Sequence, residues 1–180
     1  MVEMKVKLLL ALLLLSMVLV GCSSTRYTES NDEFLSDNFV TGNSGLTIKI
    51  PYGWFQAFDN EKNILDLWIV SGDYSASLKF KTIHFDSDKN DLHDAVEISK
   101  SVNKIINRNN RKIKDEIKNN TGSFVYRVFE DDSTLARIVI FTWKDKYYEC
   151  TANFKPGLQE SEKEKIFRLQ DEILENFLDE

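Results

Sequence analysis

The sequence has few of the residues that usually carry metal, redox or nucleophilic chemistry. Its 180 residues include two cysteines, Cys22 and Cys150, and two histidines, His84 and His93. HExxH and paired CxxC motifs are absent, so the usual ligand set of a catalytic zinc site is missing. A G-x-S-x-G nucleophile elbow and glycine-rich phosphate loops are also absent. These absences argue against a hydrolase or a zinc enzyme, and no motif predicts a cofactor.

Basic residues are fewer than acidic residues in this chain. The chain has 23 Lys and Arg residues against 29 Asp and Glu residues, which gives a formal net charge of −6. Binding to nucleic acid depends mainly on neutralising phosphates with basic side chains. The charge balance therefore argues against a nucleic acid as the partner.

The longest apolar run is too short to cross a bilayer. Lys5 and Lys7 precede an apolar stretch at 8–20, whereas a membrane-spanning helix needs about 20 apolar residues. A cationic start, a short apolar core and a small residue before the cut are typical of a secretory signal peptide. Residues 1–21 are therefore predicted to be a signal peptide that is removed.

The residues that end this signal, LVGC at 19–22, resemble the lipobox of bacterial lipoproteins. The resemblance implies cleavage before Cys22 and acylation of that cysteine, with chains such as palmitate anchoring the protein to a membrane. An ordinary signal peptide with an incidental cysteine is the alternative. The implied location is the bacterial cell envelope, and Ser23 in place of aspartate favours the outer membrane if the organism is Gram-negative. Lipidation would leave Cys150 as the only thiol, on the apolar side of a strand, where an inert side chain is expected.

The rest of the chain divides into a polar segment and an apolar-patterned domain. Residues 22–44 are rich in Ser, Thr, Asn, Asp and Gly, which predicts a flexible tether, and residues 45–180 form the predicted domain. Phe34, Leu35, Phe39 and Val40 interrupt the polar segment. Its later part is therefore expected either to dock on the domain or to add a short strand.

Within the domain, alternating apolar residues predict strands at 46–50, 64–70, 77–85, 122–130, 135–143 and 147–154. The junction at 143–147 predicts a tight hairpin. Helical spacing predicts amphipathic helices at about 91–108 and from 161 onwards, the second opening with a Ser161/Glu164 capping box. This pattern predicts an α+β fold, an antiparallel sheet with one helix on each side or both on one side.

Three landmarks in this domain resemble the PsbP/Mog1-like superfamily. They are IPYGW at 50–54, the hairpin WKDKYYECTANF at 143–154 and the helix end ILENF at 173–177. The resemblance implies an α/β/α sandwich. Members of the superfamily serve mainly as binding or assembly partners, so it also implies a protein that is not an enzyme.

The segment DSDKNDLHDAVE at 86–97 has almost the spacing of a calcium loop. Asp86, Asp88, Asn90 and Glu97 stand at positions one, three, five and twelve. However, Asp91 occupies the position of the usual turn glycine, and the preceding element is a predicted strand instead of a helix. Capping of the following helix by Asn90 or Asp91 is the preferred interpretation.

Two further sets of residues are candidates for binding. The basic residues of 100–118 could form an interaction surface for an anionic lipid or an acidic partner. The alternative is that they form a solvated helix face and loop with no binding role. These residues are Lys100, Lys104, Arg108, Arg111, Lys112, Lys114 and Lys118. A concave binding face or, alternatively, the interior would take the aromatic residues Trp54, Trp68, Trp143, Tyr147 and Tyr148.

These observations favour a membrane-anchored envelope lipoprotein whose domain binds or assembles with another envelope component. A small-ligand or lipid carrier is the main alternative. It would need a pocket between sheet and helix lined by residues such as Trp54, Trp68 and Phe80. A divergent hydrolase would need converging titratable residues, which the sequence does not indicate.

Overall fold

The computed structural model describes residues 34–58, 64–85, 89–106, 111–116 and 122–178, and the side chains of Ile106, Phe177 and Leu178 are not described. The predicted signal peptide and Cys22 lie outside these ranges, as do Asp86, Asp88, Arg108 and Lys118. Among the described helices, none is both long and apolar enough to cross a membrane.

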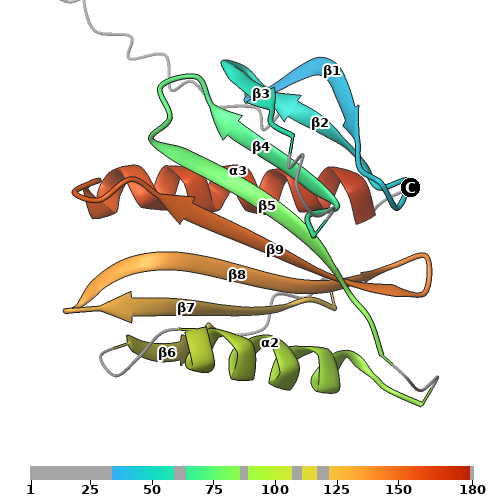
Figure 1. The fold of residues 1–180 in the computed structure, drawn as a ribbon. Helices are drawn as coiled ribbons and strands as arrows, with labels where there is room; N and C mark the ends of the chain where they lie inside the picture. The colour runs from blue at the N-terminus through green and yellow to red at the C-terminus, as the bar shows by residue number, and fades with distance from the viewer. Residues whose placement is uncertain (1–33, 59–63, 86–88, 107–110, 117–121, 179–180) are drawn as a thin grey trace, which may run out of the picture. The chain divides into compact units, whose positions relative to one another are not determined.

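A seven-stranded antiparallel sheet forms the centre of the domain (Figure 1). Its order is β3-β4-β5-β9-β8-β7-β6. The sheet therefore consists of two meanders, each continuous in sequence, joined where β5 pairs with β9. The strands are β3 (Trp54–Gln56), β4 (Leu67–Ser71), β5 (Ala76–Ile83), β6 (Arg111–Asp115), β7 (Phe124–Glu130), β8 (Ser133–Trp143) and β9 (Lys146–Phe154).

The predicted strands are present at the expected places, and β3 and β6 are additional strands that the sequence did not suggest. The residues of β6, RKIKD, were expected to belong to a helix face or a loop. Only Ile113 on β6 is half-buried, and the strand forms by pairing with β7 at the edge of the sheet. The predicted tight hairpin at 143–147 is confirmed, because Lys144 and Asp145 alone join β8 to β9, both with positive φ.

A separate two-stranded sheet contains β1 (Leu35–Thr41) and β2 (Thr47–Pro51). Leu35, Phe39 and Val40 of the expected tether lie on β1, so the later part of that segment adds a strand. Leu35 is buried in the main core, and the folded part therefore begins before residue 45. The turn between the strands packs closely on the main sheet. Ser44 receives a hydrogen bond from Tyr148 and donates one to Asp66, and a Cβ at Gly42 would lie 2.6 Å from a carboxylate oxygen of Asp66.

The larger core lies on the face of the sheet that carries Val139, Phe141 and Cys150, which we call the α3 face. Helix α3 (Glu160–Leu178) covers it with one apolar stripe that includes Phe167, Leu169 and Ile173. The predicted capping box is displaced by two residues. The backbone N–H of Gln159 donates to Glu162, and Glu164 instead reaches Arg127 on the sheet.

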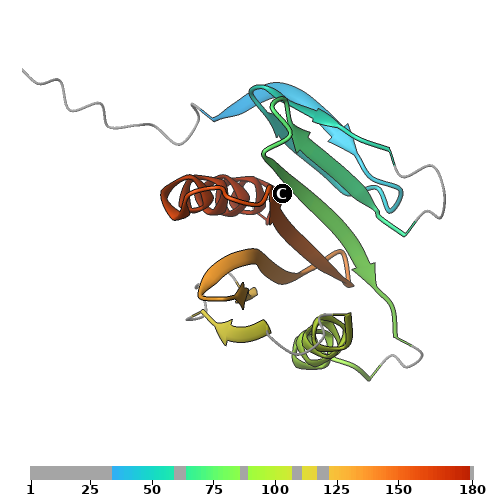
Figure 2. The ribbon, with the colours of Figure 1, turned by 60° about the vertical axis from the view of Figure 1, so that its left-hand side comes forward.

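The opposite face, the α2 face, carries a smaller core. Helix α2 (Leu92–Ile106) places Ala95 and Val96 against Tyr126, Ile138 and Ile140. Because neighbouring residues such as Ile138 and Val139 point to opposite sides of a strand, the two helices cover opposite faces. The α+β prediction is confirmed, and of its two arrangements the structure has one helix on each side (Figure 2).

Candidate functional site

The basic residues of 100–118 are divided between a helix and an edge strand. Lys100 on α2 lies 2.8 Å from Asp115 on β6 and also packs over the ring of Phe124. The ion pair between Lys100 and Asp115 therefore joins α2 to β6. Lys104 on α2 is exposed.

On β6 itself the basic side chains contact the neighbouring strand and turn. Arg111 pairs with Glu130 at 3.1 Å, Lys112 lies 3.8 Å from Asp132, and Lys114 covers the ring of Phe129. Charged side chains on an edge strand discourage pairing with a strand of another chain. This role accounts for the charges of β6 without a ligand, and their use by a partner stays a prediction.

The acidic segment before α2 acts as a helix cap in the residues that are described. The carboxylate of Asp91 accepts hydrogen bonds from the backbone N–H groups of His93 and Asp94, and Asp94 accepts one from the N–H of Asp91. The capping interpretation is therefore confirmed for Asp91. The backbone carbonyl of Asn90 accepts a hydrogen bond from Tyr147, and Glu97 is exposed on α2. Among the described residues no cluster of three potential metal ligands occurs.

Four of the five candidate aromatic residues belong to the two cores. Trp54, Trp143 and Tyr148 are in or against the core of the α3 face, and Tyr147 packs against the other core. Trp68 pairs with Lys79 and therefore points to the α2 face, away from the buried Phe80. The three residues expected to line a carrier pocket thus do not share a face and do not line one pocket together.

Near the β3 edge, the α2 face carries aromatic side chains that α2 leaves uncovered. Phe55 on β3 and Tyr74 in the β4–β5 turn are exposed, and their rings meet edge to face at a centroid distance of 5.7 Å. Phe55 lies opposite Val70, on the same side of β4 as Trp68. Helix α2 packs on β8 and β9 and lies toward the β6 end of the sheet (Figure 1). We call Phe55, Trp68 and Tyr74 the aromatic surface.

Trp68 gives the aromatic surface a polar feature. Its indole N–H is buried but has no hydrogen-bond partner among the described residues. The ammonium group of Lys79 stands 5.0 Å from the centroid of the indole ring. Tryptophan and tyrosine are enriched at the energetic centres of protein interfaces because they combine a large apolar area with a polar tip. A partner would therefore gain apolar contact with the exposed part of the rings, whereas the enclosed N–H is not accessible to it.

A small polar cluster fixes α2 to the sheet. The hydroxyl of Ser99 donates to the carboxylate of Glu149 and lies 2.6 Å from the hydroxyl of Tyr126. Asn103 donates a further hydrogen bond to Tyr126, and Thr151 donates one to Glu149. Burial raises the pKa of the Tyr126 hydroxyl, so this group stays protonated. These groups bond to one another beneath the helix, which gives them a positioning role.

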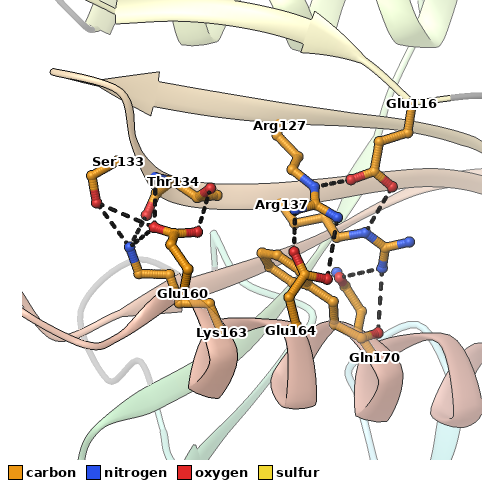
Figure 3. Close-up of polar contacts among 10 residues, drawn as sticks. Glu116, Arg127, Ser133, Thr134, Arg137, Glu160, Lys163, Glu164 and Gln170 are labelled. Atoms are coloured by element: carbon orange, nitrogen blue, oxygen red, sulfur yellow. Dashed lines mark hydrogen bonds and ion pairs between the residues drawn. The ribbon is translucent and has the colours of Figure 1, made fainter.

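A larger charged network joins α3 to the sheet (Figure 3). Arg137 on β8 is only 3% exposed, and its guanidinium contacts Glu116, Asp171 on α3 and the side-chain oxygen of Gln170. Arg127 on β7 pairs with both Glu116 and Glu164. Burial raises the pKa of Asp171 despite the opposing effect of Arg137. We call Glu116, Arg127, Arg137, Glu164, Gln170 and Asp171 the arginine clasp.

A second contact group lies at the start of α3 (Figure 3). The buried ammonium of Lys163 donates to the carbonyl of Thr134 at 2.7 Å and to Glu160 at 2.7 Å. Glu160 in turn accepts hydrogen bonds from the N–H and the hydroxyl of Thr134. Although burial acts to raise it, hydrogen bonds from Lys163 and Thr134 hold the pKa of Glu160 below its ordinary 4.5.

Cys150 lies on β9 beneath α3 and is completely buried. Burial raises the pKa of its thiol to about 12. Gln170 donates hydrogen bonds to both its carbonyl oxygen and its sulfur. A protonated, enclosed thiol is a poor nucleophile, which agrees with the structural role expected from the sequence.

Comparison with known proteins identifies the fold. The solution structure of cyanobacterial PsbP from Synechocystis sp. PCC 6803 matches with a TM-score of 0.54 and 14% sequence identity, over 86% of this chain and 95% of that one. The fold is PsbP-like. No protein-family model matches the chain, and no curated protein sequence does. The PsbP-like fold agrees with the resemblance seen in the sequence, and at this identity it carries no residue roles.

Sequence reasoning anticipated Trp68 but missed Phe55 and Tyr74. Tyr74 follows a turn residue and Phe55 is the middle residue of the short strand β3, in stretches whose apolar content did not separate surface from core. Their meeting depends on β3 pairing with β4, which brings the strand next to the β4–β5 turn. A solitary exposed aromatic in a turn such as SGDYS was the only available signal.

Proposed function

We propose that this protein is a lipid-anchored component of the bacterial envelope whose PsbP-like domain binds another envelope protein without catalysing a reaction. The aromatic surface is the observation that carries the proposal. It places Phe55, Trp68 and Tyr74 on a part of the sheet that α2 does not cover, and it includes a buried indole N–H without a partner in the described residues.

The arrangement of the charged groups supports a binding role over a catalytic one. Arg137 pairs with both Glu116 and Asp171, and Glu149 is bonded to Ser99 and Thr151. These groups hold the helices on the sheet, and most of their hydrogen bonds and ion pairs are made within the domain. A catalytic acid or base would instead have to reach a bound substrate.

The proposed anchor rests on LVGC at 19–22. The substitution Cys22→Ser should abolish incorporation of radiolabelled palmitate and move the protein from the membrane fraction to the soluble fraction. The matched control is Ser23→Ala, which keeps the cysteine and should leave both readouts unchanged. Palmitate labelling that survives Cys22→Ser would contradict the proposed anchor.

The proposed binding surface can be tested in the intact envelope with a photoreactive phenylalanine analogue. Placed at Tyr74 in the full-length chain, it should crosslink to one discrete protein. Tyr52 provides the matched control, because it is a tyrosine of similar exposure, 65% against 72%, outside the aromatic surface. Equal crosslinking from both positions, or none from Tyr74, would refute this surface.

Contact through Trp68 can then be examined separately. Trp68→Phe removes the indole N–H and retains an aromatic ring. Because the enclosed N–H is not accessible to a partner, the substitution should leave the Tyr74 crosslink within about twofold of the parent. A crosslink reduced about fivefold, the equivalent of one net hydrogen bond, would show that binding opens the indole to an acceptor. An undiminished crosslink would show that the partner uses the aromatic area alone.

A further inference from the structure

The outer side of α2 is apolar although it faces solvent. Ile98 and Val102 are each 43% exposed and Ile105 is 77% exposed, whereas Ala95, Val96 and Ser99 on the inner side are buried. The three exposed residues are spaced four and three positions apart and so form one stripe. Together with Asn90, Asp94, Glu97 and Ser101 they line a shallow, open depression of about 370 Å³. We call Ile98, Val102 and Ile105 the outer stripe.

The charges beside the outer stripe are arranged symmetrically along the helix. Glu97 lies before the centre of the stripe and Lys104 after it, with Ser101 between them. At 100° per residue both charged side chains fall on the same flank, and the rise of 1.5 Å per residue separates them by about 10 Å. This flank therefore has a negative end and a positive end about a small central residue.

We propose that the partner of the outer stripe is a second copy of this chain, with the two α2 helices packed antiparallel across a two-fold axis near Ser101. A two-fold axis perpendicular to both helices brings the same flank of each helix together with its direction reversed. Glu97 of each copy then faces Lys104 of the other copy. The outer stripes of the two copies then contact each other on the side of the interface opposite to these charges.

The size of Ser101 suits this arrangement. Helices pack at axial distances of about 8–10 Å depending on the side chains at the contact, and a serine at the crossing allows a close approach. The charges favour a second copy over a partner helix of arbitrary sequence, because the two-fold axis generates two ion pairs between Glu97 of one copy and Lys104 of the other. A parallel arrangement would instead place Glu97 beside Glu97 and Lys104 beside Lys104.

The expected interface is small. A single helix pair falls at the low end of the range for specific complexes, so the dimer should form and dissociate readily. Crosslinking is therefore the appropriate measurement, and it can be made on the full-length chain in membranes or in detergent.

The first experiment introduces Ser101→Cys and treats the protein with a short bis-maleimide. Two cysteines close to a two-fold axis should give a covalent dimer of identical chains. The matched control is Ser161→Cys, the same exposed serine substitution on α3. The unsubstituted chain reports any background from Cys22 or the buried Cys150. Dimer from both variants equally, or from neither, would overturn the proposal.

The second experiment reverses the charges in the Ser101→Cys background. Glu97→Lys alone and Lys104→Glu alone each create two like-charge contacts and should each lower the dimer yield about fivefold. The double variant restores opposite charges and should return the yield to within about twofold of the starting chain. Failure of the double variant to recover would overturn the antiparallel pairing, as would a Ser101→Cys crosslink only to a different protein.

Discussion

The two faces of the sheet are covered by helices in different ways. On the α3 face, a 19-residue helix and the β1–β2 hairpin lie over one continuous core, and the arginine clasp joins helix and strands. On the α2 face, a 15-residue helix covers the smaller core, held by the Ser99, Tyr126 and Glu149 cluster. The remainder of that face includes the aromatic surface.

This difference predicts that the two faces contribute unequally to the stability of the domain. The α3 face carries the larger core and the ion pairs of the arginine clasp, so changes there should affect the whole domain. The α2 face has exposed apolar residues both on its helix and beside it. We therefore expect substitutions on the two faces to differ in size and in how far their effects spread.

The largest effect should follow from Arg137→Met. This substitution leaves Glu116 and Asp171 facing each other without the buried guanidinium between them. Removing one partner of a buried ion pair costs about 3 kcal/mol or more. Urea unfolding followed by tryptophan fluorescence would measure this loss.

The thiol of Cys150 provides an independent reporter for the same variant. Because Cys150 lies beneath α3, Arg137→Met should speed its modification by a thiol reagent, whereas disruption of the α2 face should change that rate much less. A loss of stability below about 1 kcal/mol would indicate that Arg127 and Gln170 hold α3 without Arg137.

A smaller and more local effect is expected from Tyr126→Phe. The substitution removes the hydroxyl that bonds to Ser99 and Asn103, at a cost of about 1.5 kcal/mol. Amide hydrogen exchange should accelerate in α2 and remain slow in α3. Tyr147→Phe is the matched control, because it loses a single hydrogen bond to the carbonyl of Asn90 and should cost less. Equal acceleration in both helices would contradict the separation of the two faces.

The pH dependence of Glu160 should give a still smaller difference. Its pKa is lower in the folded state than its ordinary 4.5, so its stabilising contribution is present above that value and is lost as the pH falls through the folded-state pKa. Because Glu160 is about half exposed, Glu160→Gln should cost only about 0.5 kcal/mol at neutral pH. The difference between parent and variant should shrink as unfolding is measured at decreasing pH. A constant difference would exclude this ionisation as its source.

The smallest effect is expected at Lys112. Its contact with Asp132 is 3.8 Å long and both side chains are largely exposed, so Lys112→Glu should change stability by about 0.3 kcal/mol or less. Lys112→Val provides the contrast, because it keeps the strand but removes the charge from the edge. Static light scattering should show more self-association for the valine variant than for the glutamate variant. Identical scattering would show that the charge on β6 does not protect the edge.

Local patterns were sufficient to predict most of the fold. Alternation identified the strands that have one clearly apolar side, as in SLKFKTIHF, and helical spacing identified both helices. The edge strand β6 escaped notice because its pattern has a single apolar residue, Ile113, and its existence depends on pairing with β7. The capping residue of α3 was misplaced because Gln159/Glu162 and Ser161/Glu164 have the same spacing, and Arg127 on the distant β7 engages Glu164.

The candidate sites were less predictable for the same reason. Arg137 contacts residues 21 positions before it and 34 positions after it, at Glu116 and Asp171, and only the order of strands brings them together. Phe55 and Tyr74 likewise meet through the β3–β4 pairing. Sequence patterns report the face of an element, whereas these contacts depend on which elements become neighbours.

The join between β5 and β9 has a consequence for how the chain folds during synthesis. Phe80 on β5 pairs with Cys150 on β9, 70 positions later, whereas β7, β8 and β9 follow one another through two-residue turns at Asp131–Asp132 and Lys144–Asp145. At about 5–20 residues per second, β5 waits several seconds for β9 after leaving the ribosome. Throughout that interval the backbone N–H and C=O groups along its edge are open to pairing with other chains, so the strand that completes the sheet is also the one whose delay most exposes the nascent protein to aggregation.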